Sequence, residues 1–270
     1  MVSVPNSADR HAGQSPRGRV ALVTGSTGGI GRAVAESLAA AGCDIVLHGL
    51  AEPAEAAPEL AALAERHGVR ARYHRANLAR PGEIAAMLSD HGEPDILVNN
   101  AATRHFAAVE EMPIEAWETD LAVNLSAAFH LVRLALPAMR RRGWGRIVNM
   151  SSIYGLVGAT GRVGYVTTKT ALLGLTRAVA LETARSGITC NAICPGSTLT
   201  TNIEDRIRSA MADSGLDRAG AAARFLEGKQ PSGRFVEAAS IGAMVAFLCG
   251  EAGRDITGAA LPMDGGWSAG

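Results

Sequence analysis

The segment Arg19-Val-Ala-Leu-Val-Thr-Gly-Ser-Thr-Gly-Gly-Ile-Gly31 joins a short apolar run to a cluster of glycines. The apolar run predicts a buried strand, and the Ala-rich pattern from Gly31 to Ala41 predicts a helix that ends at Gly42. Glycines at such a junction allow a tight turn and let the backbone approach a pyrophosphate, which then faces the free N–H groups of the helix. The spacing is G-x-x-x-G-x-G and not G-x-G-x-x-G, so an ordinary glycine-rich turn is the alternative. The position of the cluster, between the first strand and the first helix, favours a dinucleotide site.

Apolar strands and helical patterns alternate along the rest of the chain. Further strands are expected at 44–48, 71–74, 95–98, 146–150, 188–194 and 258–263, and further helices at 55–67, 81–91, 114–142, 165–186 and 236–248. Repeated strand–helix units predict parallel strands joined by right-handed crossovers. We therefore expect an α/β fold, a single-domain Rossmann-type doubly wound parallel sheet with helices on both faces.

Three segments depart from this alternation. Residues 1–17 are polar and lack the apolar core of a signal peptide, so we expect a disordered tail before a domain that spans 18–270. Residues 200–229 are polar and helical without a strand partner, and we expect a small substrate lid over the carboxyl edge of the sheet. Pro137 lies inside the long helical pattern and should kink it or split off its last turn.

Composition excludes several classes of function. The 26 basic and 26 acidic side chains balance, which gives no reason to expect nucleic acid or an anionic membrane as a partner. No stretch approaches the roughly 18 consecutive apolar residues of a membrane span. The seven histidines are scattered, with no pair at metal-ligand spacing, so no metal is expected. Because the four cysteines form no C-x-x-C pair, we expect reduced core thiols in a cytoplasmic protein; they are Cys43, Cys190, Cys194 and Cys249.

Tyr165-Val-Thr-Thr-Lys169 places a phenol and an ammonium on the same face of a predicted helix. A phenol has a pKa near about 10, and a neighbouring positive charge lowers that pKa. The pair is therefore a candidate general acid/base for a hydroxyl or carbonyl group. A chance pairing on a helix, with Tyr165 as a half-buried core aromatic, is the alternative.

The end of the second predicted strand bears on the choice of nucleotide. An acidic residue there would bind the ribose 2′-OH of NAD, whereas an Arg would accept the 2′-phosphate of NADP. The chain has His48, Gly49 and Leu50 at this point, and the glycine loop contains no Arg or Lys before Arg32. The absence of a phosphate receptor favours NAD.

Over residues 18–270 the chain resembles the short-chain dehydrogenase/reductase family. The resemblance is carried by Thr24-Gly-Ser-Thr-Gly-Gly-Ile-Gly31, Asn99-Asn-Ala-Ala102, Asn124, Ser152, Tyr165-x-x-x-Lys169, Pro195-Gly196 with Thr200, and Asp264-Gly-Gly266. Ala102 departs from the pattern, since the family usually has Gly there. Within the family the chain looks most like bacterial D-3-hydroxybutyrate dehydrogenases, through segments such as Glu227-Gly-Lys-Gln-Pro231 and Asp264-Gly-Gly-Trp267. Those enzymes use NAD without an acidic residue at the second strand, which supports NAD as the cofactor here.

The resemblance implies a role for each matching residue. Tyr165 would be the acid/base, Lys169 would lower its pKa and bind the nicotinamide ribose, and Ser152 would hold the substrate oxygen. Asn124 would anchor a water that links Lys169 to solvent. Ser152 as a turn residue and Asn124 on an exposed helix face are the alternatives. The implied cofactor-binding set is Gly25, Ser26, Thr27, Gly29, Ile30, Gly31, Asn77, Leu78, Asn99, Ala101, Tyr165, Lys169, Pro195, Gly196, Thr198 and Thr200.

The substrate-binding positions differ from those of the hydroxybutyrate dehydrogenases, which hold a carboxylate with a Gln, a His, a Lys and a second Gln. The aligned residues here are Arg104, Tyr154, Arg162 and Arg206, beside Ser152 and Tyr165. Arg offers a rigid fork of donors that suits carboxylate, sulfonate or phosphonate oxygens. A solvated surface charge is the alternative for each arginine, most of all for Arg206 on the predicted lid.

We therefore expect an NAD-dependent oxidoreductase that interconverts a secondary alcohol and a ketone or aldehyde on a small anionic substrate. This would be a 3-hydroxybutyrate-like hydroxy acid, or a sugar acid, sulfonate or phosphonate. A dehydrogenase of neutral sugars, polyols or cyclic alcohols is one alternative, and a catalytically silent nucleotide-binding regulator is another. Because members of the family are usually homotetramers, the helices at 114–142 and 165–186 and the segment through Trp267 are expected at subunit interfaces.

Overall fold

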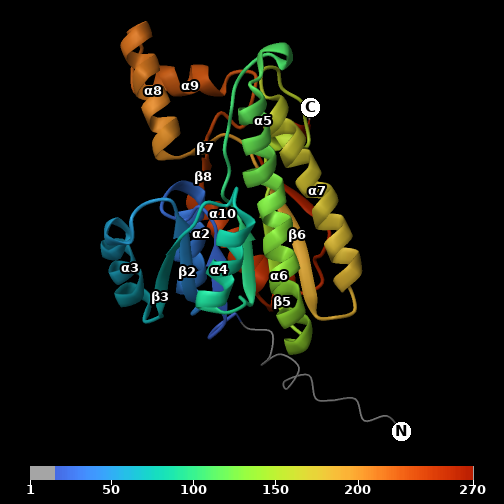
Figure 1. The fold of residues 1–270 in the computed structure, drawn as a ribbon. Coiled ribbons are helices and arrows are strands. Elements are labelled where there is room, and N and C mark those ends of the chain that lie inside the picture. The colour runs from blue at the N-terminus through green and yellow to red at the C-terminus, as the bar shows by residue number, and fades with distance from the viewer. Residues whose placement is uncertain (1–15, 270) are drawn as a thin grey trace.

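The computed structural model describes residues 16–269 and contains a seven-stranded parallel sheet in the order β3-β2-β1-β4-β5-β6-β9 (Figure 1). The strands are β1 (Val20–Val23), β2 (Asp44–Gly49), β3 (Ala71–Arg75), β4 (Ile96–Asn99), β5 (Gly145–Met150), β6 (Ile188–Pro195) and β9 (Ala260–Met263). Every neighbouring pair is parallel, which confirms the predicted Rossmann-type sheet. The strand order reverses between β1 and β4, and such sheets bind ligands in the crevice at the carboxyl ends near that point.

Helices cover both faces of the sheet, as predicted. They are α2 (Gly29–Ala40), α3 (Pro53–His67), α4 (Pro81–His91), α5 (Ile114–Leu121), α6 (Ala127–Arg142), α7 (Val163–Thr183), α8 (Thr201–Ser214), α9 (Arg218–Leu226) and α10 (Ala238–Cys249), with short 3-10 turns at Val109–Glu111, Ile153–Gly155, Glu251–Gly253 and Trp267–Ala269. Pro53 and Pro81 are the first residues of α3 and α4. The N–H that proline lacks would have no hydrogen-bond partner within the helix at this position, so no bond is lost. Gly68 ends α3 in the left-handed region, with φ 65°.

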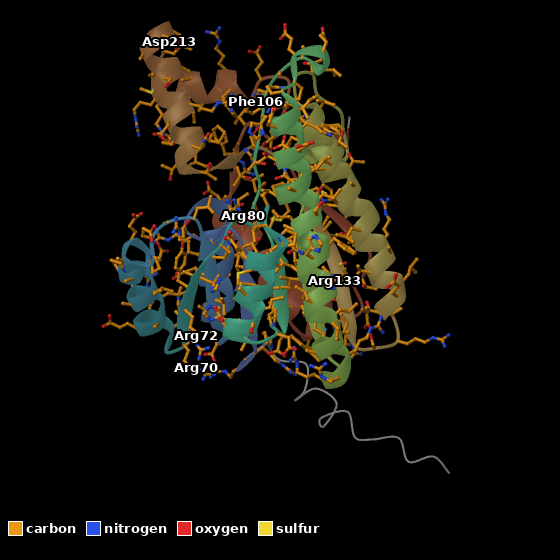
Figure 2. The ribbon with its side chains drawn as sticks, in the orientation of Figure 1. Arg70, Arg72, Arg80, Phe106, Arg133 and Asp213 are labelled. Atoms are coloured by element: carbon orange, nitrogen blue, oxygen red, sulfur yellow. The ribbon has the colours of Figure 1, made fainter. Side chains whose placement is uncertain are left out.

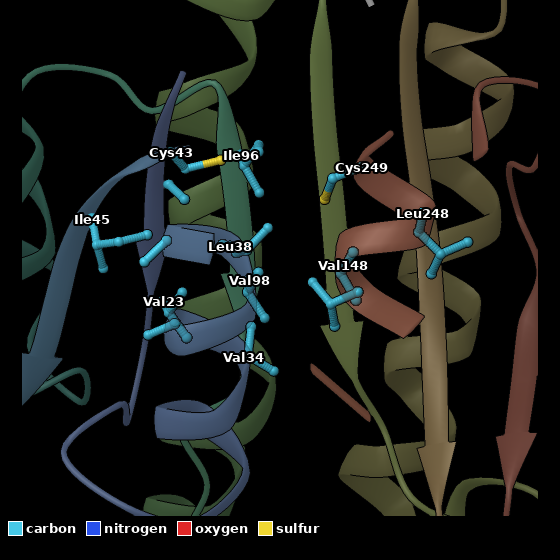
Figure 3. Packing of buried hydrophobic residues seen from close by; sticks show 14 of the residues in the cluster. Val23, Val34, Leu38, Cys43, Ile45, Ile96, Val98, Val148, Leu248 and Cys249 are labelled. Carbon is cyan, nitrogen blue, oxygen red and sulfur yellow. The ribbon is translucent and has the colours of Figure 1, made fainter. Parts of the chain in front are cut away.

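Two separate apolar clusters hold these layers together. On one face, α2, α3 and α10 pack on the sheet; Figure 3 shows Val34 and Leu38 of α2 near Val98 of β4, and Leu248 of α10 near Val148 of β5. On the other face, buried residues of α4, α6 and α7 pack against the opposite sides of the same strands. All four cysteines are buried free thiols, as expected.

The long helical pattern at 114–142 is interrupted, but not where the sequence indicated. Of the two effects predicted for Pro137, splitting off the last turn was wrong, because α6 continues through Pro137 to Arg142, and a kink at Pro137 stays a prediction. The break lies at Ala122–Ser126, which is a π-helical segment between α5 and α6. Such segments are frequent at functional sites, and this one carries Asn124.

By length and mean hydropathy the continuous helical run Ile114–Arg142 would pass as a membrane span, with 39% of its most apolar window buried. Its inner side forms part of the second core cluster, through Leu131, Ala135 and Met139. Packing on the sheet thus accounts for the apolar residues on that inner side.

A small second sheet and two helices follow β6. Thr198–Leu199 (β7) pairs in parallel with Val236–Glu237 (β8), so the helix expected from Val236 begins only at Ala238. Between them α8 and α9 pack on each other through Ile203, Ile207 and Ala221, and they stand together at one end of the molecule (Figure 1). This is the helical insertion predicted at 200–229. The predicted tail at 1–17 lies outside the described residues apart from Pro16 and Arg17. These two belong to a turn that is joined to the segment between α2 and β2 by the bond from Gly18 N to Gly42 O, 2.8 Å long.

The contact between α10 and α2 leaves no room for a side chain at Gly242. A Cβ there would lie 2.5 Å from the carbonyl oxygen of Ala33 and would also overlap the Ser37 hydroxyl. We predict that Gly242→Ala lowers the free energy of unfolding by about 1–3 kcal/mol, because the two helices must separate. Chemical denaturation measures this change. Gly82→Ala, at an open position in α4, is the matched control and should be neutral or slightly stabilising; equal stability of both variants would contradict the packing described here.

Candidate active site

The glycine loop between β1 and α2 is packed too tightly for side chains at its closest points. Gly25 has φ 61°, and a Cβ on Gly31 would overlap the Gly25 carbonyl oxygen. Asn100 closes the loop from β4, since its Nδ2 donates to the carbonyls of Thr24 (2.8 Å) and Gly25 (2.9 Å). The N-terminus of α2 has no side-chain cap. Its unpaired N–H groups, beside a backbone stripped of side chains, fit a dinucleotide pyrophosphate.

Some residues of the expected cofactor set direct their side chains into the fold. Ser26 is fully buried, and its hydroxyl donates to the carbonyl of Val23 over 2.7 Å. The Asn99 amide donates to Asn149 Oδ1 over 2.8 Å, across β4 and β5. Any contact of these two residues with a nucleotide would therefore come from their backbone. Of the remaining set, Ile30, Pro195, Gly196, Thr198 and Thr200 line one pocket with Tyr165 and Lys169, whereas Gly25, Thr27, Gly29, Gly31, Asn77, Leu78 and Ala101 lie outside its lining.

His48 supports the glycine loop from below, a role that sequence reasoning missed. Its side chain is buried, its Nδ1 accepts from the N–H of Gly25 over 3.0 Å, and its Nε2 lies 3.0 Å from the carbonyl of Ala76. A backbone N–H can only donate and a carbonyl can only accept, so the imidazole is neutral with its proton on Nε2. Burial lowers the pKa of His48, and the bond to Ala76 offsets only part of that effect. The ring therefore joins the glycine loop to the segment that follows β3.

Tyr165 and Lys169 lie on α7, beside the 3-10 turn Ile153–Gly155 that follows β5. Both side chains are buried, and Lys169 Nζ lies 5.5 Å from the centroid of the Tyr165 ring and donates to the carbonyl of Met150 over 2.8 Å. Ser151 fastens the turn to α7, because its hydroxyl donates to the carbonyl of Lys169 over 2.7 Å. Gly155 permits this contact, since a Cβ there would lie 2.8 Å from the same carbonyl.

The charges around Tyr165 favour its ionised form. Burial alone raises the pKa of Tyr165, but the positive charges of Lys169 and then Arg104, with a hydrogen bond from Ser152, outweigh burial and hold the pKa below its ordinary value. The Ser152 hydroxyl lines the same pocket and accepts from the N–H of Tyr154 over 3.2 Å. A phenol, an ammonium and a hydroxyl in this arrangement can transfer a proton to or from a substrate oxygen.

The side chain of Asn124 is fully engaged with protein groups. Its Oδ1 accepts from the N–H of Thr103 over 2.7 Å, and its Nδ2 donates to the Thr103 carbonyl (3.0 Å) and to the Thr168 hydroxyl (3.2 Å). The amide thus joins the loop after β4 to α7. A water held by Asn124 would have to use its backbone and not its side chain.

The pocket above Tyr165 is cationic. Its lining brings together all six substrate residues expected from the sequence, which are Arg104, Ser152, Tyr154, Arg162, Tyr165 and Arg206. Phe225, Lys229 and Trp267 also line it, and they were not in that set. Phe225 and Lys229 come from the insertion predicted at 200–229, and Trp267 comes from the last turn of the described chain; the sequence did not indicate that these three side chains line the pocket. Within the described residues 16–269, no Asp or Glu lines this pocket.

Aromatic rings hold the cationic groups in place. The guanidinium carbon of Arg162 lies 4.5 Å from the ring centroid of Phe106 and 5.1 Å from that of Tyr154. Phe106, labelled in Figure 2, lies between α5 and the α8–α9 pair in that view. Arg206 and Lys229 lie 5.1 Å and 4.2 Å from the ring centroid of Phe225 on α9. Burial lowers the pKa of Lys229, and so do the charges of Arg206 and Arg162.

Comparison with known proteins gives consistent relatives over nearly the whole chain. A family profile described as enoyl-(acyl carrier protein) reductase matches residues 25–268. The chain is 43% identical to D-beta-hydroxybutyrate dehydrogenase of Cupriavidus necator, covering 93% of this chain and 98% of the relative, and 40% identical to that of Rhizobium meliloti, covering 93% and 99%. Among solved structures, L-sorbose reductase from Gluconobacter frateurii complexed with NADPH and L-sorbose is 31% identical, with a TM-score of 0.89 and coverage of 95% and 99%.

The buried neutral His48 makes stability depend on pH. Its pKa is lowered on folding, so the unfolded chain binds a proton more readily, and the stability that the neutral ring contributes is lost as pH falls below the unfolded value of about 6.5. We predict that the free energy of unfolding drops less steeply between about pH 7 and pH 5 in His48→Gln than in the native chain. The difference in slope should not exceed about 1.4 kcal/mol per pH unit. Urea unfolding across this range measures both slopes, and identical slopes would contradict a buried neutral ring.

Proposed function

Since the chain belongs to the short-chain dehydrogenase/reductase family, whose matched relatives act on CH–OH groups, we propose that it is an NAD-dependent dehydrogenase of a small anionic secondary alcohol. The observation that carries the proposal is the set of four cationic side chains around the pocket, Arg104, Arg162, Arg206 and Lys229, with no acidic residue in its described lining. Unpaired cations in a pocket favour a ligand that brings its own negative charge. A 3-hydroxybutyrate-like hydroxy acid, a sugar acid, a sulfonate or a phosphonate meets that requirement.

The residues beside the pocket supply the proton chemistry. In alcohol oxidation, the phenolate of Tyr165 takes the hydroxyl proton while Ser152 holds the substrate oxygen. Lys169 stabilises the phenolate, because its ammonium is buried 5.5 Å from the ring centroid. NAD, when bound in the glycine cradle, supplies the acceptor for the hydride. Asn124 holds the loop after β4 in place through Thr103.

The segment α8–α9 is proposed as the substrate lid. Arg206 comes from α8, Phe225 from α9 and Lys229 from the turn that follows. A lid that contributes two cations would make closure respond to an anionic substrate.

The adenosine end of the site supports NAD over NADP. Gly49 ends β2 without a side chain, and a Cβ there would lie 2.8 Å from Thr27 Cγ2, so a larger residue would have to displace Thr27. Two cations flank this end of the site and are already paired. Arg32 on α2 has its Nε 2.5 Å from Glu59, and Arg75, the register partner of Gly49 on β3, has its Nη1 3.0 Å from Glu52. A 2′-phosphate would therefore meet no unpaired cation from these two residues.

A second candidate is a dehydrogenase of neutral sugars or polyols, which the similarity to L-sorbose reductase favours. Ser197 also lines the pocket, and its small polar side chain leaves room for a polar substrate. A catalytically silent nucleotide-binding regulator is the remaining alternative. It would show no turnover with either class.

We also propose a cytoplasmic homotetramer, on the pattern of the family. Phe129 on α6 and Leu181 on α7 are 48% and 80% exposed on the two helices expected at an interface. The four buried free thiols suit a reducing compartment. A solution mass of a single chain would contradict the tetramer.

Charge selectivity tests the proposed function directly. We predict that a short-chain 3-hydroxy acid is oxidised with a higher kcat/KM than its uncharged amide, and that Arg162→Gln raises KM for the acid by about 10–100-fold with little effect on the amide. NADH formation measures both rates, and Tyr165→Phe should abolish turnover. Arg72→Gln, at the far end of the molecule in Figure 2, is the matched control. Equal use of acid and amide would favour the neutral-alcohol alternative.

Cofactor preference can be tested through the pair formed by Arg75 and Glu52. We predict a lower KM for NAD than for NADP in the native enzyme. Glu52→Gln should raise kcat/KM for NADP by about two- to fivefold and leave that for NAD unchanged, because it frees Arg75 from an exposed ion pair. Glu55→Gln, also exposed near the start of α3, serves as the control. A native preference for NADP would overturn the assignment of NAD.

A further inference from the structure

We propose that Arg104 is a second cation acting on the catalytic tyrosine, held over its ring by a tether from Asp120 and Asn124. This inference rests on the proposed role of Tyr165 as the acid/base. It assigns Arg104 a function in proton transfer, in addition to any contact with the substrate anion.

The position of Arg104 follows from its two neighbours in the chain. The hydroxyl of Thr103 donates to Asp120 Oδ1 over 2.6 Å, and His105 Nδ1 lies 2.9 Å from the same oxygen. The backbone N–H and carbonyl of Thr103 both bind the Asn124 side chain. The residues on either side of Arg104 are thus bound to α5 and the π-helical segment, which leaves little freedom for the backbone between them.

Asp120 is the fixed point of this tether. Its side chain is completely buried, and a Cβ on Gly164 would lie only 2.6 Å from its Oδ2. Gly164 is the residue before Tyr165 in α7, so the carboxylate that holds the loop is packed directly against the catalytic helix. Moving Arg104 away from Tyr165 would require breaking contacts in a buried cluster.

Two cations therefore lie near one phenol. The guanidinium carbon of Arg104 is 5.0 Å from the centroid of the Tyr165 ring, and Lys169 Nζ is 5.5 Å from it. Arg104 is exposed at the pocket and forms no ion pair within residues 16–269. A positive charge at this distance stabilises phenolate relative to phenol.

The other charged and titratable groups near this cluster come from several elements. Tyr154 on the 3-10 turn after β5 has its ring centroid 6.4 Å from that of Tyr165. Asp120 on α5 and Cys194 on β6 both act on Lys169, in the direction that favours its charged form. His105 is bound to Asp120. Arg104 and Lys169 are the charged groups that act on Tyr165 itself, and each lowers the pKa of its phenol against the opposing effect of burial.

The sign of the expected effect is definite. Removing the charge of Arg104 raises the pKa of Tyr165, so the phenolate needed for alcohol oxidation forms only at higher pH. The rising limb of kcat/KM with pH should move upward by the same amount. Because Arg104 is exposed, solvent and salt screen its charge, and we expect a shift of about one pH unit, at the low end of the range for a close cation.

Tyrosinate absorbance of the cofactor-free protein measures this shift without any enzyme assay. The chain has only three tyrosines, and subtracting the titration of Tyr165→Phe isolates the catalytic one. We expect Arg104→Gln to raise the pKa of Tyr165 by about one unit and Arg104→Lys to restore most of the native value. Arg162→Gln removes the same charge from the same pocket, over Tyr154 and not Tyr165, and should leave the Tyr165 titration nearly unchanged.

The outcomes separate this inference from the proposed function. If Arg104→Gln leaves the Tyr165 titration where it is in the native protein, Arg104 is not a second cation on the phenol, whatever the substrate. An equal shift in Arg162→Gln would also overturn the inference, because the effect would then be one of overall pocket charge. If Arg104→Gln shifts the titration while no anionic alcohol is oxidised, the inference stands and the proposed substrate class fails.

Discussion

A fully buried ammonium is the constraint on which the rest of this site depends. Lys169 is 2% exposed, and its ammonium donates a hydrogen bond to a neutral carbonyl, that of Met150. Burying a charge without an opposite charge is unfavourable, so the ionised form of Tyr165 becomes its natural partner. The turn after β5, fastened by Ser151 and made possible by Gly155, packs closely against the helix that carries this pair. The fold thus lowers the pKa of the Tyr165 phenol before any substrate arrives.

The substrate pocket also holds positive charges that lack an acidic partner, but these lie nearer to solvent. Arg162, Arg206 and Lys229 repel one another, yet aromatic rings hold them around the pocket. Cation–π contacts of this kind stabilise a cation without neutralising it, so the charges stay available to a ligand. A group that arrives with negative charge relieves the repulsion without reorganising the side chains, which is how preorganisation strengthens binding. The specificity of the enzyme would then come from charge as much as from shape.

The sequence predicted the structure best where a local pattern of residues is compatible with only one kind of element. Glycines between a strand and a helix, and apolar runs alternating with helical patterns, sufficed for the parallel sheet, its helices and the cofactor loop. The failures have physical causes. Pro137 is accommodated in α6, whereas the real break at Ala122–Ser126 contains no Pro or Gly. The two-residue strands β7 and β8 are too short to show a periodic pattern.

The missed residues of the site act through tertiary contacts alone. The sequence analysis considered His48 only as a residue that binds neither a ribose hydroxyl nor a 2′-phosphate. Nothing in the local sequence reveals that its ring accepts a hydrogen bond from Gly25 in the glycine loop. Asp120 lies one turn before Asn124 and resembles any acidic residue on a helix until Thr103 and His105 are found against it. Lys229 reaches the pocket only because α8 and α9 fold over it. Long-range burial, and not sequence spacing, gives each of these residues its function.

The most direct test of the central claim is a crystal structure of Tyr165→Phe with NAD and a short-chain 3-hydroxy acid. We predict that the hydroxyl carbon lies beside residue 165 and Ser152, with the carboxylate within hydrogen-bonding distance of Arg162, Arg206 or Lys229. A carboxylate directed to solvent, with those side chains unengaged, would contradict an anion-selective dehydrogenase.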